Sequence, residues 1–182
     1  MYGMIHKAIG AMVTSKYGED TWDVILKKAK MNQSSIISLN QYPDDVTLKL
    51  VSTTADVLKI DINNCLYEFG ISWIEQATSG PYKQLFEVYG PDLLTMLSNL
   101  NTMHDSIISS FQAYIPPTFS ISNNGDNEFK VTYQSGRIGL ESFVLGLIEG
   151  MGRYYQIKLD VKQLTNTTSE KGQTTVFLLN II

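Results

Sequence analysis

Residues 115–137 read IPPTFSISNNGDNEFKVTYQSGR, and the spacing of the apolar residues changes within this stretch. Pro116 and Pro117 end the helical pattern that precedes them, and they favour extended backbone at Ile115. Beyond the prolines, apolar and polar residues alternate, which is typical of β-strands. The run at 123–126, Asn-Asn-Gly-Asp, is a hairpin signal between the two alternating segments. The stretch therefore predicts a β-hairpin directly after a helix.

Upstream of this hairpin, the apolar residues recur with the period of α-helices. Three helices are predicted first: one with Ile5, Ile9, Met12 and Val13, stopped by Gly18; one capped by Asp20 or Thr21, with Trp22, Ile25 and Leu26; and one opened by Pro43-Asp44-Asp45, with Val46, Leu50, Thr53, Val57 and Leu58 on one side. Three more follow: one capped by Asp61, with Leu66, Phe69, Trp73 and Ile74; a short one with Leu85, Phe86 and Tyr89 that ends at Gly90; and a long one from Pro91 to about Phe111.

Downstream of the hairpin, the pattern predicts one more helix and two more strands. The helix covers about Leu140 to Tyr155, and the strands cover Gln156–Leu164 and Thr174–Ile181, joined by a polar loop at Thr165–Gln173. The fold class is therefore α+β. A helical part (residues 1–115) precedes a sheet-bearing part (residues 116–182) with a four-stranded antiparallel sheet and an inserted helix. We expect the 182 residues to form a single domain.

Composition excludes several classes of function. The net charge is -4 and no run of Lys or Arg exists, so nucleic acid is not an expected partner. No stretch approaches the roughly 18 apolar residues of a membrane helix. The N-terminus lacks the basic region of a signal peptide. The one cysteine, Cys65, excludes an intramolecular disulfide and is expected to be a small core residue. We expect a cytoplasmic protein that does not bind membranes.

His104 is one of only two histidines, and it shares a helix face with apolar residues. The face comprises Leu93, Leu97, Leu100, His104, Ile107 or Ile108, and Phe111, spaced by three or four. Taken alone, this pattern fits a buried histidine that is hydrogen-bonded to backbone. It also fits an axial ligand to haem iron, for which neutral imidazole is the usual proximal group. A zinc site made only of protein usually needs three or four ligands, whereas haem needs a single one. His6 lies one position off an apolar stripe and is expected at the surface or boundary.

Tyr133, Ser135 and Arg137 form a second constellation in the segment VTYQSGR. Residues at i, i+2 and i+4 of a strand point to the same face. A phenol, a hydroxyl and a guanidinium would then converge on one side, and such a set suits carboxylates, since arginine can bind one through a bidentate fork. The alternative is a solvated strand edge. Haem is compatible with both constellations, because it presents an iron at its centre and two propionates at its edge.

The sequence resembles the H-NOX family, the haem-nitric oxide/oxygen-binding domains of bacteria and of the soluble guanylate cyclases. The resemblance covers essentially the whole chain. It includes the opening MYGMIHKAI, the segment GEDTWDVI, the His104 helix that ends in IPPTF, the YQSGR motif and the LGLIEG that follows. The motif Tyr-x-Ser-x-Arg, with an upstream helical histidine and a Pro-Pro pair after that histidine, is fairly specific for the family.

The resemblance implies the fold, the cofactor and the roles of individual residues. It implies an H-NOX fold with haem b between the helical part and the sheet-bearing part, bound without covalent attachment. His104 matches the proximal iron ligand, and Tyr133, Ser135 and Arg137 match the propionate clamp. Pro117 matches the proline that distorts the haem. The apolar positions beside the haem are Ile5, Leu147 and Met103. Some bacterial relatives resemble zinc proteins through cysteines near the C-terminus; this sequence has none there, so no zinc is expected.

Gas selectivity depends on the distal pocket, because a hydrogen-bond donor there stabilises bound oxygen. Oxygen-binding relatives carry a tyrosine shortly before the Leu-Gly of the helix that follows the motif. Counting back from Leu145-Gly146 gives Phe143 at this position, and counting forward from Arg137 gives Ser142. Trp73 is an alternative donor, for which we expect a packing role. Since neither aligned residue is tyrosine, we expect a sensor of nitric oxide that also binds carbon monoxide.

We expect a sensor and not an enzyme, because the sequence offers no Ser-His-Asp or Cys-His pair. Binding of nitric oxide is expected to weaken the iron–His104 bond and to change the shape that a partner protein contacts. Without an output module in the sequence, the resemblance implies a histidine kinase or a cyclic-di-GMP enzyme as the partner. Two other functions stay open: an oxygen-binding haem protein, and a haem-free module that uses Arg137 to bind an apolar carboxylate ligand.

Overall fold

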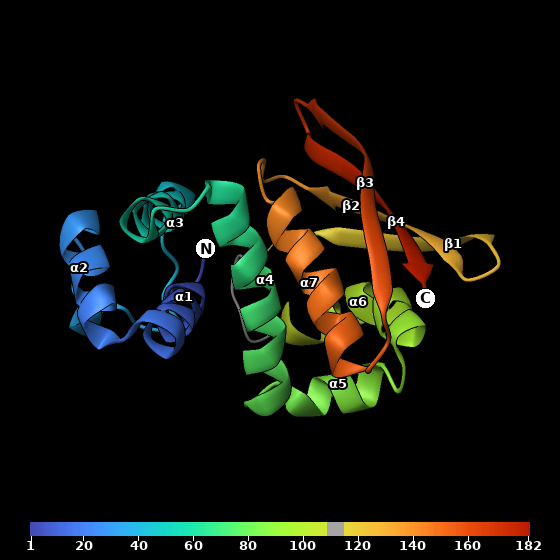
Figure 1. Cartoon of the computed structure of the whole chain (residues 1–182), viewed down its shortest axis with the longest axis horizontal. Coiled ribbons are helices and arrows are strands. Elements are labelled where there is room, and N and C mark those ends of the chain that lie inside the picture. Colours follow the sequence, from blue (N-terminus) through green and yellow to red (C-terminus); the bar gives the residue numbers. More distant parts are fainter. Residues whose placement is uncertain (109–114) are drawn as a thin grey trace.

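The computed structural model describes residues 1–108 and 115–182 of the chain. In Figure 1 the first three helices lie at one end, two packed helices occupy the middle, and the β-sheet lies at the other end. The first group is α1 (Gly3–Tyr17), α2 (Glu19–Ala29) and α3 (Asp44–Leu58), with a 3-10 helix at Gln33–Ser35. The remaining helices are α4 (Ile62–Ser79), α5 (Lys83–Tyr89), α6 (Leu93–Ile108) and α7 (Glu141–Tyr154).

The four strands form one antiparallel sheet in the order β1-β2-β4-β3. They are β1 (Thr118–Gly125), β2 (Glu128–Ser135), β3 (Leu159–Ser169) and β4 (Gly172–Ile181). Helix α7 follows β2 and precedes β3 in the chain. The predicted α+β class, with a four-stranded antiparallel sheet and one inserted helix, is confirmed.

The loop predicted at residues 165–173 is wrong. Strand β3 continues to Ser169 and β4 begins at Gly172, so Glu170 and Lys171 turn the chain between two long paired strands. The polar run from Thr165 onward is exposed at the edge of the sheet. Threonine favours strands whether or not it is buried, so the low hydrophobicity of this run was a misleading signal.

The ends of several helices agree with the sequence signals, and two do not. Gly18, with φ of 87°, ends α1, and the Asp61 carboxylate accepts a hydrogen bond from the Asn63 backbone N–H at 2.8 Å at the start of α4. Neither Asp20 nor Thr21 caps α2, because that helix already begins at Glu19. Helix α6 begins at Leu93, two residues after Pro91, and Asp92 accepts a hydrogen bond from the Thr95 backbone N–H at 2.9 Å. The predicted extension of this helix to Phe111 lies outside the described residues.

Of the residues expected on one side of α3, Leu50 is buried and the others are half-buried. The buried residues are Thr47, Leu50, Val51, Thr54 and Ala55, of which only Leu50 was expected. The buried threonines are tolerated because their hydroxyls are satisfied: that of Thr54 donates to the backbone carbonyl of Leu50 at 2.8 Å, and that of Thr47 lies 2.7 Å from a ring nitrogen of His6.

The surface or boundary position expected for His6 is also wrong, since the side chain is 0% exposed between α1 and α3. Its Nε2 atom lies 2.7 Å from Thr47 Oγ1, and its ring centroid lies 4.9 Å from that of Tyr42. No hydrogen-bond partner for Nδ1 exists among the described residues. The close fit extends to Gly3, where a Cβ would lie 2.2 Å from the carbonyl oxygen of Ile37. His6 therefore belongs to the packing of α1 against α3.

Helices α4 and α7 approach each other closely enough for backbone contact. A Cβ at Gly70 would lie 2.2 Å from the carbonyl oxygen of Phe143, and one at Gly146 would lie 2.1 Å from that of Tyr67. Both helices therefore need a residue without a side chain at the crossing. Tyr67 also donates a hydrogen bond to the Glu149 carboxylate at 2.5 Å across the same pair of helices. None of the helices in the described ranges is long and apolar enough to cross a membrane.

The burial of His6 predicts a dependence of stability on pH. Burial, followed by the nearby N-terminal ammonium, lowers the pKa of His6 below its usual value. Below about pH 6.5 the unfolded chain then takes up a proton that the folded chain does not, so stability falls as pH falls, by at most about 1.4 kcal/mol per pH unit for one group. The fall ends once pH drops below the folded-state pKa.

The measurement is urea unfolding of the wild type and of His6→Gln between pH 7.5 and 5. His104 is present in both proteins, so its own titration cancels in the comparison. We expect the wild type to lose more stability than His6→Gln over this interval. Parallel pH profiles for the two proteins would show that His6 does not titrate differently in the folded and unfolded states.

Candidate functional site

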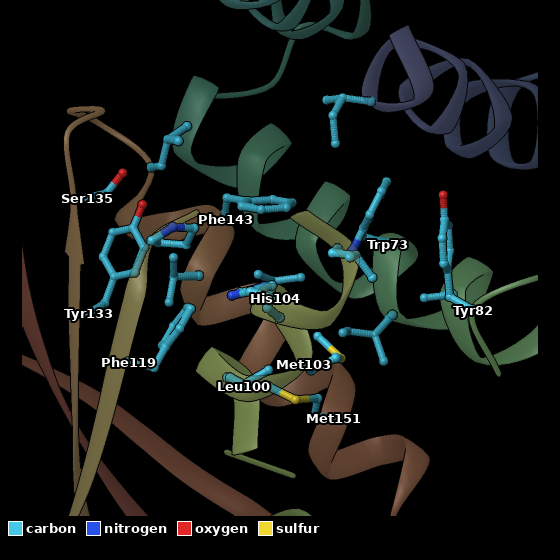
Figure 2. A pocket seen from close by; sticks show the side chains of 18 of the residues that line it. Trp73, Tyr82, Leu100, Met103, His104, Phe119, Tyr133, Ser135, Phe143 and Met151 are labelled. Carbon is cyan, nitrogen blue, oxygen red and sulfur yellow. The ribbon is translucent and has the colours of Figure 1, made fainter. Parts of the chain in front are cut away.

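A cavity lies where α1, α4, α5, α6 and α7 meet the first two strands (Figure 2). Its volume is about 260 Å³. Every site residue predicted from the sequence lines it except one: Ile5, Trp73, Met103, His104, Pro117, Tyr133, Ser135, Arg137, Phe143 and Leu147. Among the described residues, Ser142 is not part of the lining. Of the two alignments of the distal position, counting back from Leu145-Gly146 therefore selects the cavity residue, Phe143.

His104 is presented to the cavity by α6, which is fastened to the sheet one turn earlier. The Asn101 side chain donates to the backbone carbonyl of Phe119 at 2.7 Å and accepts from its N–H at 2.9 Å. Phe119 belongs to β1, and its ring lies 6.2 Å from the His104 ring and 5.4 Å from the Tyr133 ring, centroid to centroid. Two hydrogen bonds and a row of rings thus fix the position of His104 relative to the sheet.

The His104 imidazole is suited to metal ligation by its protonation state. Burial lowers its pKa, against smaller opposing effects of the Asp105 carboxylate and of a hydrogen bond to the backbone of Pro117. The ring is the donor in that hydrogen bond, because proline has no N–H. A neutral imidazole that donates from one nitrogen keeps a lone pair on the other, which is the state that a metal ion requires.

Tyr133 and Ser135 lie next to each other, at an end of the cavity away from His104 (Figure 2). Tyr133 is 2% exposed, and burial raises the pKa of its phenol, so the group is a hydrogen-bond donor at neutral pH. Strand β2 ends at Ser135, so Arg137 lies beyond the strand. A tight bend brings it back, in which the Arg137 backbone N–H donates to Ser135 Oγ at 3.0 Å. All three residues line the cavity, but the strand geometry accounts for only two of them, Tyr133 and Ser135.

Arg137 is held by protein groups that the sequence did not reveal. Its Nε donates to Asp44 Oδ2 at 2.8 Å, and its Nη1 donates to the carbonyl of Ile115 at 3.3 Å. Asp44, at the start of α3, also accepts from the N-terminal ammonium of Met1 at 2.8 Å. Although burial alone would raise it, these two cations hold the pKa of Asp44 below its usual value. The carboxylate therefore stays ionised and orients the guanidinium, which has further N–H groups for a second anion.

The remaining wall of the cavity is apolar and partly aromatic. Phe143 stacks on Phe69 with ring centroids 5.0 Å apart, and Phe69 meets Trp73 edge-on at 6.2 Å. Sequence reasoning missed several residues of this wall, including Met4 and Tyr82, whose hydroxyl donates to the Met4 sulfur at 3.7 Å. The helical spacing around His104 could have indicated Leu100 and Ile107, which line the cavity, but no local signal marks Met4 or Tyr82.

The donor set fits haem. The cavity is lined mainly by apolar side chains, with a neutral imidazole in its wall and an arginine, a phenol and a hydroxyl gathered at one end. Such a lining suits a flat apolar group that carries a metal at its centre and carboxylates at one edge. Within residues 1–108 and 115–182, no group of three or more His, Cys, Asp or Glu side chains is placed to hold a metal ion.

Comparison with known proteins agrees with this chemistry. Residues 2–163 match the family model described as Haem-NO-binding. The chain is 29% identical over 157 residues to the soluble guanylate cyclase gcy-35 of Caenorhabditis elegans, covering 84% of this chain and 23% of the relative. It is 19% identical over 175 residues to the soluble guanylate cyclase 89Da of Drosophila melanogaster, covering 96% and 26%. The chain thus spans about a quarter of the length of these relatives.

Solved structures show the same fold. An H-NOX domain studied for the molecular mechanism of its activation superposes with a TM-score of 0.88 at 18% identity, covering 100% of this chain and 96% of that one. An oxygen-binding H-NOX domain related to soluble guanylate cyclases, solved as its oxygen complex, gives 0.85 at 18% identity, with coverage of 100% and 95%. Together with the family match over residues 2–163, these comparisons confirm the predicted H-NOX fold and a sensor rather than a catalytic domain. The chain belongs to the haem-NO-binding family of gas-binding haem sensor domains.

Proposed function

We propose that this protein is a sensor of nitric oxide that holds one haem b in the cavity, with His104 as the axial ligand to the iron. The observation that carries the proposal is that His104 and the group Tyr133, Ser135 and Arg137 line the same apolar cavity. Haem held there would supply a ferrous iron that can bind nitric oxide or carbon monoxide, and binding of nitric oxide would weaken the bond to His104.

Different residues of the chain would bind different parts of the cofactor. His104 supplies the neutral imidazole, and its hydrogen bond to the backbone of Pro117 orients the ring. Arg137, with Tyr133 and Ser135, meets the propionates at the polar end. Ile5, Met103 and Leu147, which line the cavity, would exclude water from the apolar faces of the cofactor, and Pro117 would press on it. Since the sequence offers no Cys-x-x-Cys-His segment, the attachment is non-covalent.

The signal passes through α6. If the bond between His104 and the iron were lost, this helix would be released at one point while Asn101 still tied it to Phe119 on β1. A shift of α6 is therefore passed to the sheet-bearing part of the molecule, so that gas binding biases a two-state element. The partner that responds is a histidine kinase or a cyclic-di-GMP enzyme in the cytoplasm. The proposal includes no zinc, no nucleic acid and no membrane partner.

Selectivity against oxygen is expected because Phe143 occupies the cavity position at which oxygen-binding relatives carry a tyrosine. Bound oxygen carries partial negative charge and needs a distal donor, whereas nitric oxide and carbon monoxide depend on one much less. The fold itself also supports oxygen binding, as the superposed oxygen complex shows for that relative. An oxygen-binding haem protein is therefore the second candidate.

The first prediction tests the cofactor and its ligand together. Protein expressed with adequate haem should show a Soret band from one extractable haem b. His104→Ala should lose most of it, and free imidazole should partly restore it. His6→Gln is the matched control, because it alters the other histidine, which is not part of the cavity lining. Absorption spectra of the three proteins check this. A haem-free wild type that cannot be reconstituted, or equal loss in both variants, would contradict the proposal.

The second prediction concerns the clamp. Arg137→Ala leaves a propionate without its cation, which costs about 1.5–3 kcal/mol, or roughly tenfold to a hundredfold faster haem loss. Arg137→Lys should rescue only part of this, since an ammonium lacks the planar fork. Haem transfer to apomyoglobin measures the rates. Arg153→Ala, at the chain's other arginine, is the control. Asp44→Asn removes the ion pairs of Asp44 with Arg137 and with the N-terminal ammonium while leaving the guanidinium in place. Wild-type rates in both Arg137 variants would rule out a clamp.

The third prediction concerns the gas. The deoxygenated ferrous protein should bind nitric oxide and carbon monoxide but should not form a stable complex in air, and Phe143→Tyr should move it toward oxygen binding by supplying a hydroxyl. Visible spectra recorded after mixing with each gas provide the measurement. A persistent oxygen complex in the unmutated protein would favour the second candidate function while leaving the haem assignment intact.

A further inference from the structure

The two tryptophans of the chain differ in how their indole N–H groups are used. Trp22 is 5% exposed and donates to the Gln33 side chain at 2.7 Å, so its hydrogen bond is made within the protein. Trp73 lines the cavity, and its N–H has no acceptor among the described residues. A donor on the wall of a mainly apolar cavity, with no acceptor in the part of the chain that the structure describes, is available to whatever occupies that cavity.

The ring of Trp73 is held in place by its neighbours. It meets Phe69 edge-on, with an angle of 70° between the ring planes, and Phe69 stacks on Phe143 of α7 with an angle of 26°. These rings sit beside the crossing where Gly70 brings the backbones of α4 and α7 into contact. Figure 2 shows Trp73 reaching in from α4 and His104 from α6. The N–H is therefore presented by a rigid part of the wall, on a different helix from the one that carries the imidazole.

We propose that the Trp73 indole N–H is the hydrogen-bond donor to the diatomic ligand. Trp73, and not a tyrosine, then sets the strength of hydrogen bonding to the bound gas. The inference rests on the proposed function, because it needs a gas bound at haem in this cavity. One neutral hydrogen bond changes affinity by about two- to tenfold. Trp73 then gives the protein a preference of this size for polarised ligands.

Tyr82 is the rival donor in the cavity. Its hydroxyl donates to the sulfur of Met4 at 3.7 Å, and a thioether is a weak acceptor that a better one could replace. The two candidates differ in that the Tyr82 hydroxyl already has an acceptor, whereas the Trp73 N–H has none within residues 1–108 and 115–182. The structure therefore favours Trp73, and Tyr82→Phe belongs in the test.

The experiment is infrared spectroscopy of the carbon monoxide complex of the ferrous holoprotein. A hydrogen bond to the carbon monoxide oxygen weakens the C–O bond, so removing the donor should raise the C–O stretching frequency. Trp73→Phe and Trp73→Leu remove the N–H and leave side chains of different volume, and both should shift the band in the same upward direction. Trp22→Phe removes the N–H that Gln33 satisfies, and it should leave the band in place.

The outcomes separate the two proposals. A normal Soret band with an unchanged C–O frequency in both Trp73 variants would overturn this inference and leave the proposed function standing. Shifts of opposite sign in the two variants would show an effect of packing instead of a donor. A shift in Tyr82→Phe with none in the Trp73 variants would assign the donor to Tyr82. Absence of a Soret band from the unmutated protein would overturn the proposed function and the inference with it.

Discussion

The close crossing of α4 and α7 is the constraint on which the rest of the structure depends. Gly70 and Gly146 let the two backbones touch, since a Cβ at either position would lie 2.2 Å or less from a carbonyl oxygen of the other helix. Because α4 follows the N-terminal helices and α7 is inserted between strands of the sheet, this contact joins the two parts of the molecule. It also sets the aromatic wall of the cavity, since Trp73 and Phe143 flank it on the two helices.

Two sets of polar contacts hold the cavity walls together beside this crossing. The Asn101 amide ties α6, and with it His104, to β1 through paired hydrogen bonds to one residue. The Asp44 carboxylate, bound to the N-terminal ammonium and to Arg137, ties α1 and α3 to the end of β2. The imidazole and the guanidinium are therefore each anchored across elements far apart in the chain. Because Asn101 and Asp44 each join elements of both parts, a movement of His104 or of Arg137 would displace residues in both parts of the protein. A sensor requires coupling of this kind.

Much of the fold and the site could be predicted because their signals are local. Helical spacing places His104 on an apolar face. The bend that returns Arg137 toward the cavity forms within the Tyr133 motif itself, through the hydrogen bond from the Arg137 backbone N–H to Ser135 Oγ. The errors arose where partners come from distant segments. His6 is buried because Thr47 and Tyr42 receive its ring, and no spacing rule contains that information. The partnership of Asp44 with Arg137, 93 residues away, is likewise invisible along the chain. The position of the β3–β4 turn was predicted wrongly because the exposed threonines at the end of β3 are polar, as is typical of a loop. They are paired in an edge strand.

The most direct test of the account is resonance Raman spectroscopy of the ferrous holoprotein, because it reports the bond between the iron and the imidazole. Protein labelled with nitrogen-15 histidine should show an iron–histidine vibration that moves to lower frequency with the label, persists in His6→Gln, and disappears when nitric oxide is added. A spectrum with no isotope-sensitive iron–nitrogen vibration, or one in which the vibration survives His104→Ala, would contradict the central claim that His104 holds the haem iron.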